Sequence, residues 1–134
     1  MAAYWVLIGL MLQFSLEVVN YIEHYGLRRK EVAPGKYERV SNMHSWNTAD
    51  SLNNFLVYKF TRHSDHHENA ARPYQALQLM DSSPELPLGY DLSLNIALKP
   101  KLWFAMIDPL VNAYQKQERP PSEDEIANCI AIGR

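Results

Sequence analysis

The chain has 134 residues, which is long enough for one domain with a buried core. Its 13 basic and 15 acidic side chains give a formal net charge of -2, so no overall positive field draws it toward nucleic acid, and we expect no nucleic-acid partner. A single cysteine, Cys129, excludes an intramolecular disulfide and cysteine-based zinc or iron-sulfur sites. Any metal must therefore be held by histidines and carboxylates.

The first stretch is a candidate membrane span. Large apolar side chains dominate residues 2–19, and continuing through Tyr21 gives the roughly 20 residues that a bilayer requires. No basic residue precedes the run, as a cleavable signal peptide would need. The basic residues 28–30 follow it, which by the positive-inside rule places that end in the cytoplasm. We predict a transmembrane helix over residues 1–25, with Gly26 as its stop.

Polar residues interrupt this helix along one stripe, at positions i, i+4, i+7 and i+11: Gln13, Glu17, Asn20 and His24. Because polar groups at membrane depth are costly, the stripe should face a bundle interior or a polar site. His24, at the cytoplasmic end, could supply an imidazole to a metal, although the stripe could equally serve only interhelical hydrogen bonds. A soluble amphipathic helix fits less well, since the apolar face is wide.

The middle of the chain begins as a charged loop, in which Lys36–Val40 could form a short strand after a Pro-Gly turn. His44 follows, close to Trp46. A lone histidine beside a tryptophan is more often packed than ligating, so we place His44 among the residues that orient ligating imidazoles through their other ring nitrogen. Asp65 and Glu17 are the carboxylates best placed for the same task.

A helix is predicted over residues 50–72, capped by Asp50 or Ser51 and ending before Pro73. Near its end it carries three histidines at i, i+3 and i+4: His63, His66 and His67. Side chains at this spacing share one helix face, so the imidazoles can aim at one point, as the ligands of a transition metal do. The alternative is a solvated, histidine-rich helix end.

The last third contains a segment, 92–98, that fits either a helix or a strand. After it, apolar residues recur with helical spacing: Trp103, Met106, Ile107, Leu110, Val111 and Tyr114. We expect this face to pack on the fold, with the membrane interface as the alternative, and a break or kink at Asp108-Pro109. Residues 117–121 resemble a linker, and residues 122–125 a capping box that opens a short helix.

Three segments together resemble one protein family. They are Asn20-Tyr21-Ile22-Glu23-His24-Tyr25-Gly26, His44-Ser45-Trp46-Asn47 and Arg62-His63-Ser64-Asp65-His66-His67. In this order and spacing they are similar to the membrane-bound alkane 1-monooxygenases, relatives of the integral-membrane desaturases and hydroxylases. The likeness covers roughly residues 10–110, and Met43 stands where the family pattern leads us to expect an acidic residue.

The resemblance implies an all-α fold in which residues 1–25 form the last helix of a longer bundle in the cell inner membrane. It implies a cytoplasmic, mostly helical metal-ligand region over residues 26–118 and a tail over 119–134. Members hold two irons with histidines, activate dioxygen, and hydroxylate the terminal carbon of an alkane held in membrane lipid, with electrons from a rubredoxin-type donor. Four histidines match iron-ligating positions: His24, His63, His66 and His67. His44 matches a supporting position.

The family's two earlier histidine motifs have no counterpart in the sequence. We therefore expect a fragment of a longer enzyme that, expressed alone, neither hydroxylates alkane nor binds two irons. A hydroxylase of aromatic methyl groups, of the xylene type, is an alternative. A non-catalytic membrane protein that binds one metal through histidines is another.

Overall fold

The computed structural model describes residues 1–117 and 121–132, without the side chain of Gln117. Helices dominate it: α1 Ala2–His24, α2 Ser51–Leu56, α3 His63–Glu68, α4 Tyr90–Ala97, α5 Pro100–Gln117 and α6 Glu123–Ile132. Two 3-10 turns, η1 Asn42–His44 and η2 Tyr74–Ala76, and one hairpin of β1 Glu31–Ala33 with β2 Lys36–Tyr37 complete it. The expectation of a mostly helical chain is thus confirmed, with a small hairpin added.

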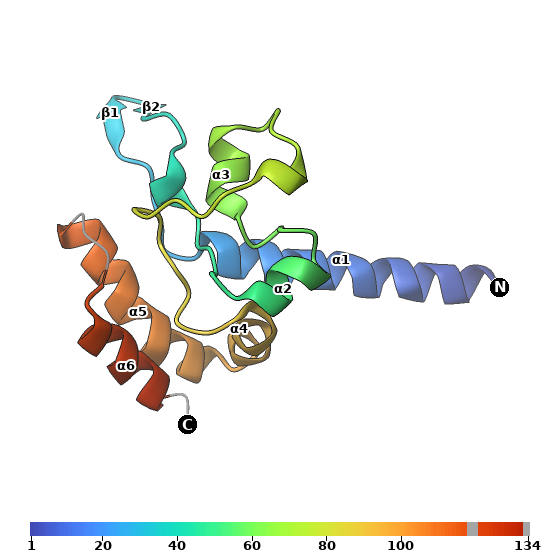
Figure 1. Ribbon diagram of the computed structural model, residues 1–134. Helices are drawn as coiled ribbons and strands as arrows, with labels where there is room; N and C mark the ends of the chain where they lie inside the picture. The colour runs from blue at the N-terminus through green and yellow to red at the C-terminus, as the bar shows by residue number, and fades with distance from the viewer. Residues whose placement is uncertain (118–120, 133–134) are drawn as a thin grey trace.

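Helix α1 projects from the rest of the molecule, and only its C-terminal part is surrounded by other elements (Figure 1). It is the one helix among the described residues that is long and apolar enough to cross a membrane, with a mean hydropathy of 1.7 over its most apolar window, none of which is buried. Burial begins at Ile22 and Glu23. The apolar surface of α1 is therefore left for another environment, whereas its last turn belongs to the core.

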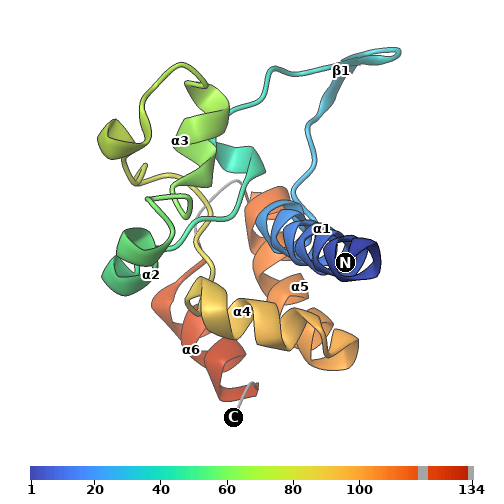
Figure 2. The ribbon, with the colours of Figure 1, turned by 90° about the vertical axis from the view of Figure 1, so that its right-hand side faces the viewer.

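The core lies where the end of α1 meets α4, α5 and α6, which are grouped on one side of α1 in both views (Figures 1 and 2). Its buried members come from α1, α4, α5, α6 and two loop segments: Ile22, Trp46, Leu86, Tyr90, Trp103, Met106, Ile107, Leu110, Tyr114 and Cys129. The predicted apolar face of α5 is buried here, so it packs on the fold rather than lying free. Helix α6 adds Cys129, so residues predicted as a tail pack against α5.

The turn after α1 is set by Gly26, as expected. Its φ of +75° is a left-handed conformation that favours glycine, and a Cβ there would lie 2.6 Å from Cγ2 of Val111 on α5. The Pro-Gly turn also forms, between β1 and β2, although the strand predicted over residues 36–40 covers only its first two residues. The segment 92–98 is helical, as part of α4.

One predicted helix is wrong, and one predicted interruption is narrowed. The helix predicted over residues 50–72 is two short helices, because Tyr58 and Lys59 adopt positive φ of 53° and 58° between them. Lys59 is held in that turn by its Nζ, which donates to the backbone oxygens of Gln75 and Leu77 at 2.7 and 3.3 Å. Of the break or kink predicted at Asp108-Pro109, the break is absent, because α5 continues through Pro109.

Local signals predicted the helix starts correctly. Asp50 caps α2 by accepting from the Leu52 backbone N–H at 2.8 Å. Ser122 and Glu125 form the reciprocal capping contacts that open α6, at 3.3 and 2.7 Å. The division predicted between residues 118 and 119, and most of the predicted linker, lie outside the described residues.

Candidate metal centre

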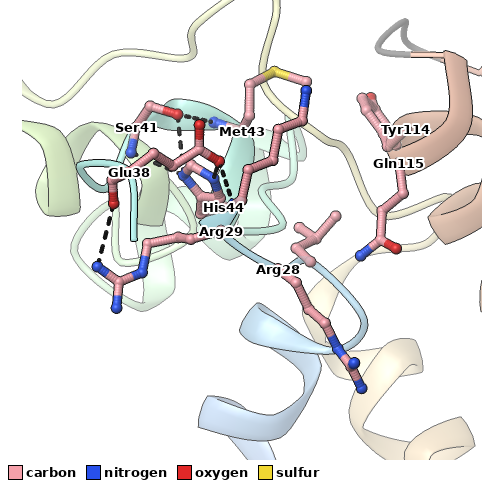
Figure 3. A pocket seen from close by; sticks show the side chains of 10 residues that line it. Arg28, Arg29, Glu38, Ser41, Met43, His44, Tyr114 and Gln115 are labelled. Atoms are coloured by element: carbon pink, nitrogen blue, oxygen red, sulfur yellow. Dashed lines mark hydrogen bonds and ion pairs between the residues drawn. The ribbon is translucent and has the colours of Figure 1, made fainter. Parts of the chain in front are cut away.

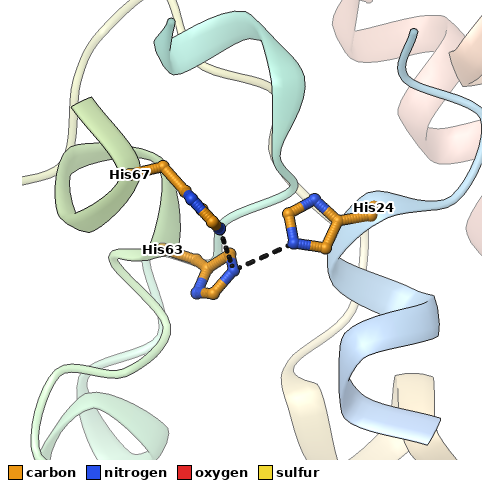
Figure 4. Close-up of side chains that lie close together, drawn as sticks. All are labelled: His24, His63 and His67. Atoms are coloured by element: carbon orange, nitrogen blue, oxygen red, sulfur yellow. Dashed lines mark hydrogen bonds between the residues drawn. The ribbon is translucent and has the colours of Figure 1, made fainter. Parts of the chain in front are cut away.

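Three imidazoles converge beside the last turn of α1 (Figure 4). His24 is the final residue of α1, and His63 and His67 lie one turn apart on α3. The Nε2 atom of His63 is 3.2 Å from that of His24 and 2.8 Å from that of His67. One ring nitrogen from each of the three lies within 4.8 Å of the other two. Residues almost 40 positions apart thus present their nitrogens to a common point.

This spacing fits the donor set of one metal ion. With metal–nitrogen bonds of about 2.1 Å, neighbouring donors on a tetrahedral or octahedral ion are about 3.0 to 3.4 Å apart. The observed Nε2 separations are close to that range. Without an ion, at most one proton can lie between each facing pair of nitrogens, whereas a cation accepts a lone pair from all three. The residues present therefore fit a transition-metal ion.

Two of the imidazoles, those of His63 and His67, are held in the neutral form that binds metals. Burial, together with the positive charges that His67, His24 and His66 can carry, lowers the pKa of His63 to about 3. Burial likewise lowers the pKa of His67 below its ordinary value, with contributions from His24 and His66. At neutral pH both rings keep a lone pair available for a metal.

His66 lies apart from these three residues. It is exposed, as His67 also is, and its ring centroid lies 6.2 Å from that of His63 and 5.9 Å from that of His67. A helix turns by about 100° per residue, so His66 and His67 point in clearly different directions. Of the three histidines predicted to share a face, the structure brings His63 and His67 together with His24 and leaves His66 at the rim.

The segment His44-Ser45-Trp46-Asn47 joins the end of α1 to α3. The Trp46 backbone N–H donates to the backbone carbonyl oxygen of Glu23, and the Trp46 indole Nε1 donates to the backbone carbonyl oxygen of Tyr25, both at 2.8 Å. Trp46 is completely buried. The His24 Nδ1 lies 3.3 Å from the His44 carbonyl oxygen, and donation to that oxygen leaves the Nε2 lone pair of His24 facing the cluster.

Asn47 makes the connection to α3. Its Oδ1 accepts from the Ser64 backbone N–H at 3.1 Å, and its Nδ2 donates to the Ser64 hydroxyl. The same Nδ2 donates to the Pro84 oxygen at 3.1 Å. Since Ser64 follows His63 directly, Asn47 fixes the first turn of α3, and with it the position of His63.

The residues predicted to support the site contact other groups. The His44 imidazole accepts from the Ser41 backbone N–H at 2.9 Å and lies 3.1 Å from a Glu38 oxygen, so only the His44 carbonyl meets a cluster residue. Glu17 is exposed and accepts from Gln13 at 2.6 Å. Neither the His44 ring nor Glu17 contacts His24, His63 or His67 through a hydrogen bond.

Asp65 stabilises the loop after α3 rather than an imidazole. Asp65 is completely buried. Its carboxylate accepts from Nη1 of Arg72 at 2.6 and 2.7 Å, and it also accepts from the Asn69 side-chain amide and from the Gln78 backbone N–H. Burial alone would raise the pKa of Asp65, but the Gln78 amide and Arg72 hold it below its usual range. Asp65 therefore carries a negative charge that anchors residues 69–78 to α3.

Sequence reasoning missed Glu23. This residue is 1% exposed, and its Oε2 lies 3.4 Å from Nε2 of His63. Its Oε1 accepts from the Tyr90 hydroxyl of α4 at 2.7 Å. The polar stripe on α1 does not include Glu23, which is turned by about 100° from His24. Its position directly before His24 was the sequence signal that could have marked Glu23 as a residue of the site.

A cavity of about 480 Å³ is lined in part by the His44 imidazole (Figure 3). Its lining includes the basic residues that follow α1, with Tyr114 and Gln115 of α5 on the other side. Arg29 stacks over the Tyr37 ring, 5.7 Å from its centroid, and donates to the Glu38 oxygen at 3.4 Å. The rim of the cavity is therefore positively charged and close to the end of α1.

Comparison with known proteins assigns the chain to a family. The model of the fatty acid desaturase family matches residues 1–92. Alkane 1-monooxygenase 2 of Pseudomonas aeruginosa is 50% identical over 103 residues, which are 77% of this chain and 27% of that protein. The alkane 1-monooxygenase of Acinetobacter baylyi is 48% identical over 102 residues, 76% of this chain and 25% of that protein.

A xylene/toluene monooxygenase hydroxylase component of Pseudomonas putida is 29% identical over 113 residues, 84% of this chain and 29% of that protein. The chain thus spans about a quarter of the length of the curated relatives that it matches. The matched region contains α1, the connecting segment and α3, which carry all three converging histidines. The chain belongs to the fatty acid desaturase family, within which it is similar to the alkane 1-monooxygenases.

Proposed function

We propose that this chain forms the histidine-bearing part of a non-haem diiron membrane monooxygenase that hydroxylates the terminal carbon of alkanes with dioxygen. The observation that supports this most strongly is the convergence of His24, His63 and His67 in a chain about half identical to alkane 1-monooxygenases. The 29% identity to the xylene/toluene hydroxylase component makes an aromatic methyl substrate the second candidate.

Iron is the proposed metal, and when bound it would supply the one-electron chemistry that activates dioxygen. His24, His63 and His67 would hold one ion through Nε2, with His24 oriented by the His44 carbonyl. His66, whose ring is 5.9 Å from that of His67, would serve the second ion. Four imidazoles are about half of what two irons require, so further ligands would come from segments that the longer relatives possess.

The proposed enzyme lies in the cell inner membrane with its metal centre on the cytoplasmic side. Helix α1 would span the bilayer, because its apolar side chains are exposed along its length. Its C-terminal end, which carries His24, is followed by Arg28, Arg29 and Lys30, as the positive-inside rule requires of a cytoplasmic end. A rubredoxin-type electron donor would approach from the cytoplasm, and alkane would enter from membrane lipid. In this arrangement residues 26–118 form the metal-ligand region and residues 119–134 the tail.

A chimera tests the proposal. The matched segment of the Pseudomonas aeruginosa alkane 1-monooxygenase 2 is replaced by the corresponding 103 residues of this chain. Membranes with a rubredoxin and its reductase are then assayed for conversion of octane to 1-octanol, and of xylene to its benzylic alcohol. We expect 1-octanol, and we expect its loss in the same chimera with His63→Ala.

The level of inserted protein, measured in the membranes, is the control for folding. A chimera that inserts at the level of the parent enzyme but makes no 1-octanol would contradict the proposal. Benzylic alcohol in place of 1-octanol would favour the second candidate. Activity that survives His63→Ala would show that the imidazole cluster is not the metal centre.

A further inference from the structure

Glu23 places a carboxylate oxygen against the central imidazole of the cluster. Its Oε2 lies 3.4 Å from Nε2 of His63, the same nitrogen that faces Nε2 of His24 and of His67. This separation is close to that of two donors on one ion with bonds of about 2.1 Å. The carboxylate therefore approaches His63 on its metal-facing side.

Among the described residues, the polar contacts of the His63 ring all lie on that side. Its other nitrogen, Nδ1, is buried and has no hydrogen-bond partner among the residues that the structure describes. The polar neighbours of the ring, His24, His67 and Glu23, all meet it at Nε2. His24, His63 and His67 offer nitrogens that all lie within 4.8 Å of one another, a set that Glu23 does not join in this structure, so the Glu23 side chain would turn toward a cation bound there.

The surroundings of Glu23 favour a nearby positive charge. The side chain is 2% exposed, and its hydrogen-bond donor is the hydroxyl of Tyr90, which is itself buried on α4. A carboxylate in the interior is costly unless a cation or several donors compensate it. Conversely, three neutral imidazoles leave both positive charges of a divalent ion uncompensated. The Glu23 carboxylate and the ion would therefore each reduce the desolvation cost of burying the other's charge.

We propose that Glu23 is a carboxylate ligand of the metal held by His63, and that Tyr90 is a positioning residue that fixes its second oxygen. This assignment rests on the proposed function only in that a metal binds at the histidine cluster. It adds an anionic donor to a site that the sequence pattern presents as histidine alone. It also gives α4 a role, because Tyr90 is its first residue.

The test uses the full chain in detergent micelles, titrated with Co²⁺, whose visible absorption reports its donors. Glu23→Gln keeps the size of the side chain and an oxygen that can accept from Tyr90, but removes the charge. We expect it to weaken Co²⁺ binding at least tenfold and to change the visible band, and Tyr90→Phe to weaken binding by a smaller factor. Glu17→Gln is the matched control on the exposed side of the same helix, and should bind as the unmodified chain does.

The outcomes separate the two proposals. If the unmodified chain binds Co²⁺ and loses it on His63→Ala, while Glu23→Gln keeps the affinity and spectrum of the unmodified chain, the assignment of Glu23 is overturned and the histidine centre stands. If the unmodified chain binds no Co²⁺, both fail. Circular dichroism of the metal-free proteins reports folding, and if Glu23→Gln does not fold, unchanged affinity and spectrum in Tyr90→Phe overturn the assignment.

Discussion

Asn47→Leu should destabilise the chain more than any single hydrogen bond would suggest. Asn47 is 1% exposed, and its amide contacts Ser64, Ser45 and Pro84. Leucine fills a similar volume but satisfies none of these groups. The Ser64 backbone N–H, in the first turn of α3, would lose its acceptor inside the protein.

The magnitude follows from the groups left without partners. A buried donor or acceptor that loses its partner costs about 1 to 3 kcal/mol. The Pro84 oxygen keeps the Asn47 backbone N–H, at 2.8 Å, so it remains satisfied. The Ser64 N–H is then the principal loss, and the Ser64 hydroxyl and the Ser45 backbone oxygen are smaller ones, so we expect a decrease of about 2 to 4 kcal/mol in the free energy of unfolding.

Urea denaturation in detergent micelles, followed by tryptophan fluorescence, measures this change because Trp46 is buried beside Asn47. Asn42→Leu is the matched control, since Asn42 makes one hydrogen bond, to the Ser82 hydroxyl at 2.7 Å, in an exposed position. It should cost about 1 kcal/mol or less. A loss below 1 kcal/mol for Asn47→Leu would refute the role of Asn47 as the link between α1 and α3.

Three further predictions follow from the same structure. Gly26→Ala should lower the free energy of unfolding by about 1 to 2 kcal/mol, because alanine is strained at φ +75° and its Cβ would contact Val111. Gly9→Ala is the control, since a Cβ at Gly9 meets nothing within 4 Å, and it should not lower the free energy of unfolding in the same urea titration. In the metal-free chain, His63 has its ordinary pKa of about 6.5 when unfolded and a pKa of about 3 when folded. The free energy of unfolding should therefore be highest above pH 6.5 and should fall as the pH drops from 6.5 toward 3. In urea denaturation between pH 4 and pH 7, His63→Gln should reduce the change of the free energy of unfolding with pH. The same change with pH in both proteins would contradict the assignment of this effect to His63. Expressed alone, the chain should retain at most one iron per polypeptide in elemental analysis and form no 1-octanol, and two tightly held irons would overturn the division of ligands proposed above.

Sequence patterns predicted the parts of the fold that depend on neighbouring residues. The apolar run of α1, the amphipathic spacing of α5 and the caps at Asp50 and Ser122 are local signals, and each of these elements forms. The helix over residues 50–72 failed because contacts from distant residues decide its middle. Lys59 is fixed by carbonyls 16 and 18 residues later, which no local pattern reports.

The candidate centre was predictable in composition but not in arrangement. Helical spacing indicated that His63 and His67 could converge, and the stripe on α1 indicated His24. The same spacing gave no reason to leave out His66, because the direction of a six-residue helix is set by Asn47 and by Asp65 with Arg72. Glu23 was missed because its importance depends on Tyr90, 67 residues away.

X-ray absorption of the iron-loaded chain tests the central claim, that His24, His63 and His67 bind one ion, most directly. Imidazole rings produce a characteristic outer-shell scattering, which counts the histidines around the metal. We predict a shell with three imidazole nitrogens at about 2.0 to 2.2 Å, reduced by one in His24→Ala and in His67→Ala. A shell without imidazole, or one that neither substitution changes, would contradict the account.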